Sequence, residues 1–195
     1  MKQKRTLLIS AAGLALVLAA AALLYPRLSQ QAAPSAGSDA GVELPDPIPA
    51  VDFTLENSRG EMVSFLEQLD GRPAVLNFWA STCGPCRQEM PFFQQAYETY
   101  GEDIQFLMVN VMEAMGDTRE AAQEYLTEQG FTFPVYYDTR LDGVYSYGLQ
   151  GFPTTFLLNG EGEVVLGYSG MMLDDLLQTY LHYAFPSLVE APDRD

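Results

Sequence analysis

The chain of 195 residues has only two cysteines, Cys83 and Cys86, and Gly84 and Pro85 separate them. Outside the cytosol, two cysteines ordinarily form a structural disulfide. A bridge across so short a loop adds little stability, because the stabilisation from restricting the unfolded chain grows with the length of the loop. The spacing therefore favours a redox-active pair over a structural one.

A redox cysteine needs a lowered thiol pKa and an exposed sulfur, because the thiolate is the form that attacks disulfides. Cys83 lies just before a predicted helix, whose unpaired N–H groups and dipole favour negative charge. Pro85 suits the first helical turn, and Gly84 lets the chain bend there. We therefore expect Cys83 to form a mixed disulfide with a client and Cys86, the more buried thiol, to resolve it.

The alternative for a C-x-x-C spacing is a zinc site, which requires four ligands when it is structural. Beyond the two sulfurs the chain has a single histidine, His182, in a region predicted to be helical. We therefore expect no metal, and no cofactor other than the redox-active disulfide itself.

The charge of the chain is strongly asymmetric. Four of the ten basic residues precede residue 28, whereas all 26 acidic residues follow it. A surface this acidic would be repelled by phosphate backbones, so we expect no nucleic-acid partner.

The N-terminus resembles a membrane-inserted segment. Three cations within residues 1–5 precede Leu7–Tyr25, nineteen uncharged and mostly apolar residues. A helix of that length spans about 28 Å, close to the hydrocarbon core of a bilayer. We expect residues 1–27 to be an anchor, or alternatively a cleaved signal segment, with the rest of the chain outside the cytoplasm.

Hydrophobic periodicity and turn residues predict the remaining organisation. Residues 28–49 have a linker composition, residues 50–186 form one domain, and residues 187–195 form an acidic tail. A hairpin turn is predicted at Asn57–Gly60, and another at Asn159–Gly162. We expect strands at 52–55, 62–65, 73–80, 103–111, 133–138, 154–158 and 164–169, and helices at 86–100, 117–129 and 171–185. This order predicts an α/β fold with a mixed central sheet and helices on both faces.

The segment Phe78–Pro91 (FWASTCGPCRQEMP) resembles the active-site segment of thioredoxins, and more closely that of the TlpA/ResA-like branch. Asn77 in the preceding strand, Glu89 after the second cysteine, the leading hairpin and the inserted helix near 117–129 all favour this branch. The resemblance covers about residues 50–185. It implies a thioredoxin-like fold with an N-terminal β-hairpin extension and an inserted helix.

The resemblance also assigns roles to further residues. Pro153 aligns with the cis-proline that faces the sulfurs and whose neighbour pairs with a bound client. Glu89 aligns with an acidic residue that could exchange a proton with Cys86. Thr82 and Phe152 depart from the residues common in the family, which affects client preference. The expected client-binding residues are Trp79, Thr82, Gly84, Pro85 and Phe152.

These observations predict an extracytoplasmic thiol:disulfide oxidoreductase that reduces exported client proteins, with electrons from a membrane thiol carrier. The resemblance implies a link to cytochrome c maturation through apocytochrome c thiols. Alternatives are a disulfide oxidase or isomerase, and a non-catalytic binding module on the membrane surface with an inert disulfide. A peroxide reductase would need a hydroxyl three residues before Cys83, where this chain has Ala80.

Overall fold

The computed structural model describes residues 46–191. The predicted anchor at 1–27 and nearly all of the predicted linker lie outside these residues. The strands are β1 Ile48–Pro49, β2 Thr54–Glu56, β3 Met62–Ser64, β4 Ala74–Trp79, β5 Gln105–Asn110, β6 Val135–Tyr137, β7 Thr154–Leu158 and β8 Glu163–Ser169. The α-helices are α2 Gly84–Tyr100, α3 Arg119–Gln129, α4 Asp142–Ser146 and α5 Asp174–Ala184, and two 3-10 helices are η1 Leu66–Leu69 and η2 Met112–Met115.

One mixed sheet forms the centre of the domain, with the strand order β1-β8-β7-β4-β5-β6-β2-β3. Strands β4, β5 and β6 run parallel, whereas β7 pairs antiparallel with β4 and β8 antiparallel with β7. The β2–β3 hairpin joins the far edge through β6. This arrangement confirms the predicted fold class.

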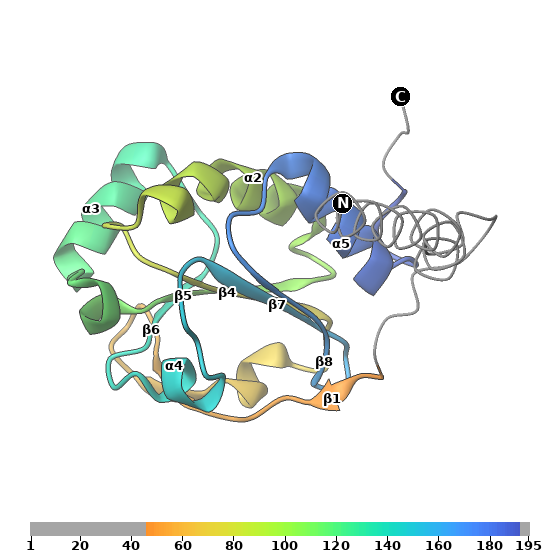
Figure 1. Cartoon of the computed structure of the whole chain (residues 1–195), viewed down its shortest axis with the longest axis horizontal. Coiled ribbons are helices and arrows are strands. Elements are labelled where there is room, and N and C mark those ends of the chain that lie inside the picture. Colours follow the sequence, from red (N-terminus) through yellow and green to blue (C-terminus); the bar gives the residue numbers. More distant parts are fainter. Residues whose placement is uncertain (1–45, 192–195) are drawn as a thin grey trace, which may run out of the picture. The chain divides into compact units, whose positions relative to one another are not determined.

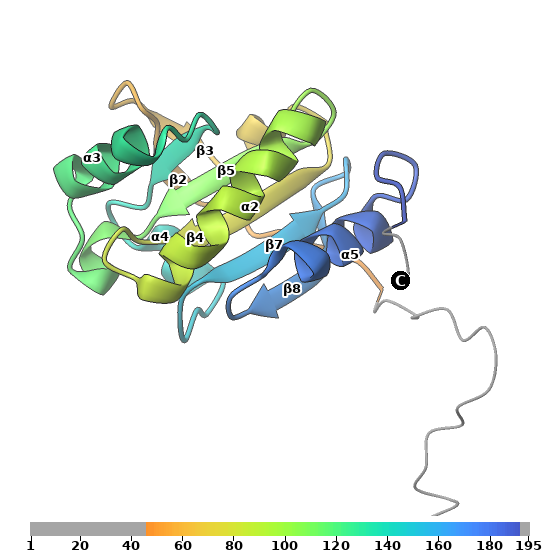
Figure 2. The ribbon, with the colours of Figure 1, turned by 90° about the horizontal axis from the view of Figure 1, so that it is seen from above.

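Helices cover both faces of the sheet (Figure 1). Helices α2, α3 and α5 lie on one face, and α4 and η1 lie on the other. Seen from above, α2 crosses the centre of the sheet over β4 (Figure 2). All six residues of β4 are buried, as expected for a central strand that is covered on both sides.

The amphipathic pattern explains how α2 packs. Its buried apolar residues include Cys86, Met90, Phe93 and Ala96, which recur at steps of three and four and therefore share one helix face. The helix begins at Gly84, with Cys83 as its N-cap, two residues earlier than the pattern predicts.

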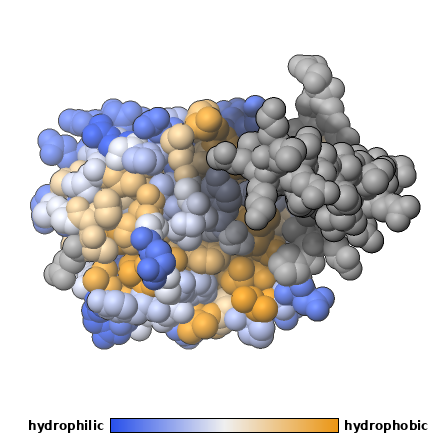
Figure 3. Space-filling view, in the orientation of Figure 1, coloured by the Kyte–Doolittle hydropathy of each residue, from blue (hydrophilic) through white to orange (hydrophobic). Residues whose placement is uncertain are grey.

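Hydrophilic side chains gather along the outer edge of the molecule, over α3 (Figure 3).

Four short elements were not predicted: β1, η1, η2 and α4, each of two to five residues. Elements this short carry little hydrophobic pattern of their own; β2 and β3 are equally short but were predicted together with the turn that joins them.

Both predicted ends of the domain also differ from the structure. Strand β1 lies in the predicted linker. Because it pairs with β8, the sheet already includes Ile48, two residues before the predicted start of the domain. The predicted tail begins at 187, yet Val189 is only 1% exposed and its carbonyl lies 2.8 Å from Nδ1 of His182. Burial of the apolar Val189 side chain accounts for this packing of the tail. Among residues 46–191, no helix is long and apolar enough to cross a bilayer.

Helix α4 packs closely against an aromatic cluster on its face of the sheet. The cluster consists of Phe53, Phe65, Phe78, Tyr147 and Phe156. Gly143 of α4 is buried, and a Cβ atom there would lie 2.5 Å from Cε2 of Phe53 and 2.9 Å from Cε1 of Phe78. Only glycine therefore fits this position without displacing the rings.

We predict that Gly143→Ala lowers the free energy of unfolding by about 1–3 kcal/mol, because the added methyl group overpacks the cluster. Urea denaturation measures this change. Ser146→Ala, an exposed substitution on the same helix, is the control and should stay within about 0.5 kcal/mol of the wild type. Equal stability of Gly143→Ala and the control would contradict the close packing.

Candidate active site

Cys83 and Cys86 are joined by a disulfide at the N-terminus of α2, with their Cα atoms 5.3 Å apart. Cys83 is the N-cap residue, and the backbone N–H of Cys86 donates to its sulfur at 3.3 Å. Pro85 lies in the first turn, where its missing N–H leaves no hydrogen bond unmade. The sulfur of Cys83 therefore lies where the helix N–H groups favour a negative charge.

The sulfurs are less exposed than the sequence analysis expects. Cys83 is 4% exposed and Cys86 is fully buried. The cis-proline loop closes one side of the site, because the carbonyl oxygen of Phe152 lies 3.8 Å from Sγ of Cys83. Thr82, Gly84 and Pro85 around the disulfide are exposed. A client must therefore reach Cys83 through a narrow opening, and Cys86 is the more buried thiol as predicted.

Strand register brings the second loop to the disulfide. The antiparallel pairing of β4 with β7 places Phe78 opposite Thr154, so the end of β4 meets the start of β7. The Phe152–Pro153 peptide bond, just before β7, is cis. The hydroxyl of Thr154 donates to the carbonyl of Gly151 at 2.8 Å, which holds the loop in shape.

Glu89 is a fully buried carboxylate one turn after Cys86. Its Oε1 accepts from Nδ2 of Asn77 at 2.9 Å, and its Oε2 accepts from the backbone N–H of Met172 at 2.8 Å. Burial raises the pKa of Glu89 to about 7, and these two hydrogen bonds only partly oppose that rise. Glu89 can therefore change protonation near neutral pH.

The sequence analysis named Asn77 only as a mark of the family branch and did not identify Met172, although both hold Glu89 in place. Asn77 also donates to the hydroxyl of Thr155 at 3.0 Å. The side chain of Asn77 on β4 therefore contacts both Glu89 of α2 and Thr155 of β7. Met172 lies 83 residues after Glu89 and acts through its backbone, so no side-chain pattern could indicate its role.

Trp79 is fully buried, as a core residue, and its ring packs against that of Tyr125 with centroids 6.1 Å apart. Any effect of Trp79 on a client must therefore pass through its neighbours.

His182 contacts the carbonyl of Val189 and lies in α5. Among the described residues, no group of three or more His, Cys, Asp or Glu side chains could hold a metal ion.

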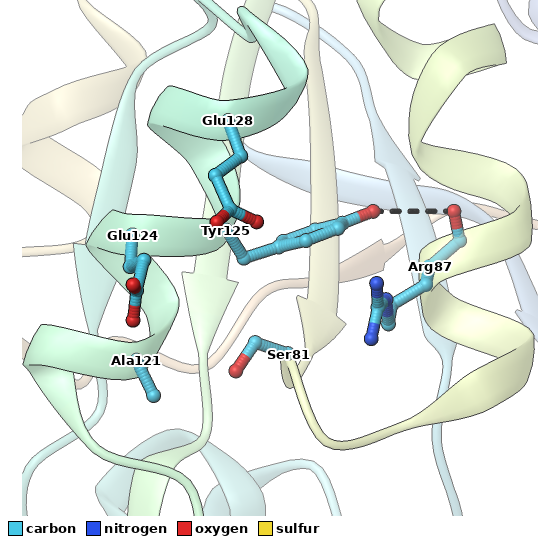
Figure 4. A pocket seen from close by; sticks show the side chains of 6 residues that line it. All are labelled: Ser81, Arg87, Ala121, Glu124, Tyr125 and Glu128. Carbon is cyan, nitrogen blue, oxygen red and sulfur yellow. Dashed lines mark hydrogen bonds between the residues drawn. The ribbon is translucent and has the colours of Figure 1, made fainter.

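A pocket of about 300 Å³ lies between α2 and α3, beside the turn that carries the cysteines. Arg87 and Tyr125 form one side of it (Figure 4). The guanidinium of Arg87 lies 4.7 Å from the centre of the Tyr125 ring, whose hydroxyl donates to the carbonyl of Arg87 at 3.3 Å. The other lining residues are Ser81, Ala121, Glu124 and Glu128. These contacts attach α3 to the active-site helix.

Comparisons with known proteins identify the family. Residues 43–175 match the Redoxin family. The thiol-disulfide oxidoreductase ResA of Halalkalibacterium halodurans is 33% identical over 138 residues, which are 70% of this chain and 76% of the relative.

Solved structures also resemble this chain. StoA from Bacillus subtilis matches with a TM-score of 0.56 and 28% identity, over 67% of this chain and 95% of that chain. The exposed lipoprotein thioredoxin Etrx1 from Streptococcus pneumoniae matches with a TM-score of 0.56 and 27% identity, over 67% of this chain and 98% of that chain.

These findings agree with the helix-capping disulfide and with the resemblance of the Phe78–Pro91 segment. The chain belongs to the Redoxin family and, within it, to the ResA-like thiol-disulfide oxidoreductases.

Proposed function

We propose that this oxidoreductase reduces disulfides in exported client proteins, with Cys83 as the attacking thiol and Cys86 as the resolving thiol. The observation that carries this assignment is the difference in position of the two sulfurs. Cys83 caps the helix and retains 4% exposure, whereas Cys86 is sealed beneath the turn. A client sulfur can therefore approach Cys83 but not Cys86.

The reaction balances as two exchanges. The thiolate of Cys83 attacks one sulfur of a client disulfide, which breaks the client S–S bond and releases one client thiolate. The thiolate of Cys86 then attacks the sulfur of Cys83, which forms the bond present in this structure and releases the second client thiolate. Two electrons pass from the dithiol to the client. A membrane thiol carrier must reduce the disulfide again before the next cycle.

The client-binding surface in this proposal surrounds the opening above Cys83. Thr82, Gly84 and Pro85 are its exposed residues on one side, and Phe152 is half-buried on the other. The backbone beside Pro153 would pair with an extended client segment as an added strand does. In this proposal, one client class is apocytochrome c whose thiols have been oxidised to a disulfide.

The proposed location is outside the cytoplasm, with the chain attached to the membrane by residues 1–27. The three N-terminal cations and the nineteen uncharged residues after them support this proposal. The pneumococcal relative is itself an exposed lipoprotein, so a related domain works at a cell surface.

Glu89 has a proton-transfer role in this proposal. When the disulfide opens, the leaving sulfur of Cys86 becomes a thiolate that a nearby acid can protonate. Glu89 lies one turn along the same helix, is fully buried and has a pKa of about 7. It can therefore donate a proton during opening and accept one when the disulfide forms again.

We predict that Cys86→Ser traps clients as mixed disulfides on Cys83, because the resolving thiol is gone. The full chain, reduced and then mixed with exported proteins, should yield adducts that mass spectrometry places on Cys83 and that dithiothreitol releases. Cys83→Ser is the matched control and should yield no adducts. Adducts on Cys86 in that control would reverse the assigned roles.

We predict that the rate of disulfide reduction by dithiothreitol, after correction for ionisation of the reagent thiol, has an inflection near pH 7 in the wild type and that Glu89→Gln removes this inflection. Glu98→Gln, an exposed substitution on the same helix, should retain the wild-type profile.

Stability provides a second readout for the same variant. The folded pKa of Glu89 is raised above its ordinary value of 4.5, so the wild type should lose stability relative to Glu89→Gln as the pH rises from about 4.5 through 7. Urea unfolding at pH 5 and pH 8 measures this difference. Parallel profiles for wild type and Glu89→Gln in both experiments would leave Glu89 no role in proton transfer.

A further inference from the structure

Asp117 is a second buried carboxylate, 5% exposed, in the loop between β5 and α3. Its Oδ2 accepts from the backbone N–H of Ser81 at 2.5 Å and from Nδ2 of Asn110 at 2.9 Å. Its Oδ1 accepts from the hydroxyl of Ser81 at 2.6 Å and from the backbone N–H of Thr118 at 2.9 Å. An ionised carboxylate only accepts hydrogen bonds, so this arrangement of four donors fits the charged form.

Within residues 46–191, no ion pair joins a cation to Asp117. The ion pairs there join Arg59 to Glu61, Arg119 to Glu56 and Arg140 to Asp142. The four donors of Asp117 are neutral groups, which stabilise the carboxylate without cancelling its charge. Since the carboxylate is also buried, water and salt screen its field only weakly.

The charge of Asp117 lies close to the reactive sulfur. Ser81, which Asp117 holds through both its N–H and its hydroxyl, precedes Cys83 by two residues in the same turn. Chain geometry then limits the distance between the carboxylate and the sulfur to on the order of 10 Å. The hydroxyl of Thr82 also donates to the carbonyl of Met115 at 3.0 Å, so the same loop is attached to the turn at a second point.

We propose that Asp117 is a positioning residue of the dithiol, which fixes the turn through Ser81 and whose negative charge opposes ionisation of Cys83. This proposal rests on the proposed function, since it explains why the dithiol would give electrons to clients. A charge that disfavours the thiolate destabilises the reduced state relative to the disulfide. The reduced protein then transfers its two electrons more readily.

Of the other charged or titratable groups around the dithiol, some favour ionisation of the Cys83 thiol and others oppose it. The N–H groups of α2 and the guanidinium of Arg87 favour a thiolate, whereas an ionised Glu89 disfavours it. Tyr125 faces the site from α3, and burial raises the pKa of its hydroxyl. The cis-proline loop, residues 150–154, and the loop before α5, residues 170–173, contain no titratable side chain. The carboxylates of Glu124 and Glu128 on α3 line the pocket beside Ser81, but they are exposed and solvent screens them, and the guanidinium of Arg119 is paired with Glu56. Asp117 is the buried carboxylate that contacts Ser81 directly.

Removing the charge of Asp117 and removing the Ser81 hydroxyl that donates to it should shift the pKa of the Cys83 thiol in opposite directions. Asp117→Asn removes the charge, so the Cys83 thiol pKa should fall by about half to one unit, which raises the thiolate fraction near neutral pH about three- to tenfold. Ser81→Ala retains the carboxylate but removes one donor from it, so the thiol pKa should rise slightly. Loosening of the turn alone would move both variants in the same direction.

The experiment measures the pH dependence of iodoacetamide alkylation of Cys83 in the reduced full chain, together with the equilibrium with a dithiothreitol redox buffer. Asp117→Asn should be alkylated faster at pH 7, and its disulfide should be reduced more readily than that of the wild type. Ser81→Ala should show the reverse. Circular dichroism establishes that each variant is folded, and Ser81→Ala, the milder change, still tests the sign if Asp117→Asn does not fold.

Shifts of the same sign in both variants, or no shift in either, would overturn the role of the Asp117 charge. That result would leave the proposed function intact as long as wild-type Cys83 reacts and exchanges with disulfides. An unreactive Cys83 in the wild type would instead overturn the proposed function itself.

Discussion

The contact between the N-terminus of α2 and the loop before β7 is the constraint on which the site depends. The end of β4 leads directly into the cysteine turn, and the antiparallel register with β7 brings Phe152 and Pro153 to the same edge of the sheet. The sulfur of Cys83 then accepts a hydrogen bond from the backbone N–H of Cys86 and lies 3.8 Å from the carbonyl oxygen of Phe152. The buried β4 strand is thus the element that aligns both halves of the site.

Two buried carboxylates distinguish this site from a bare disulfide at a helix end. Glu89 accepts two hydrogen bonds, and burial leaves its pKa near neutrality, which suits proton exchange. Asp117 accepts four hydrogen bonds, which favours a fixed charge. The sulfurs of the disulfide are almost entirely removed from water.

Much of the fold was predictable because its long elements have clear periods and ends. The apolar run of β4, the periodicity of α2 and the predicted end of a helix at residue 129 all agree with the structure. The cysteine spacing and the surrounding motif were sufficient to locate the site. The short helix α4 and strand β1 were not predicted, since they carry little hydrophobic pattern and no predicted turn adjoins them. The contact of Asp117 with Ser81 spans 36 residues and depends on how two loops meet, so the sequence analysis placed Asp117 only at the start of a predicted helix.

The central claim is that Cys83 alone exchanges with partners while Cys86 stays sealed. The most direct test is the rate at which a small alkylating reagent labels each cysteine in the reduced wild-type protein, resolved by mass spectrometry. The 4% exposure of Cys83 and the complete burial of Cys86 predict that Cys83 is labelled at least about tenfold faster over the whole range of pH that the fold tolerates. Equal rates, or faster labelling of Cys86, would contradict this account of the site.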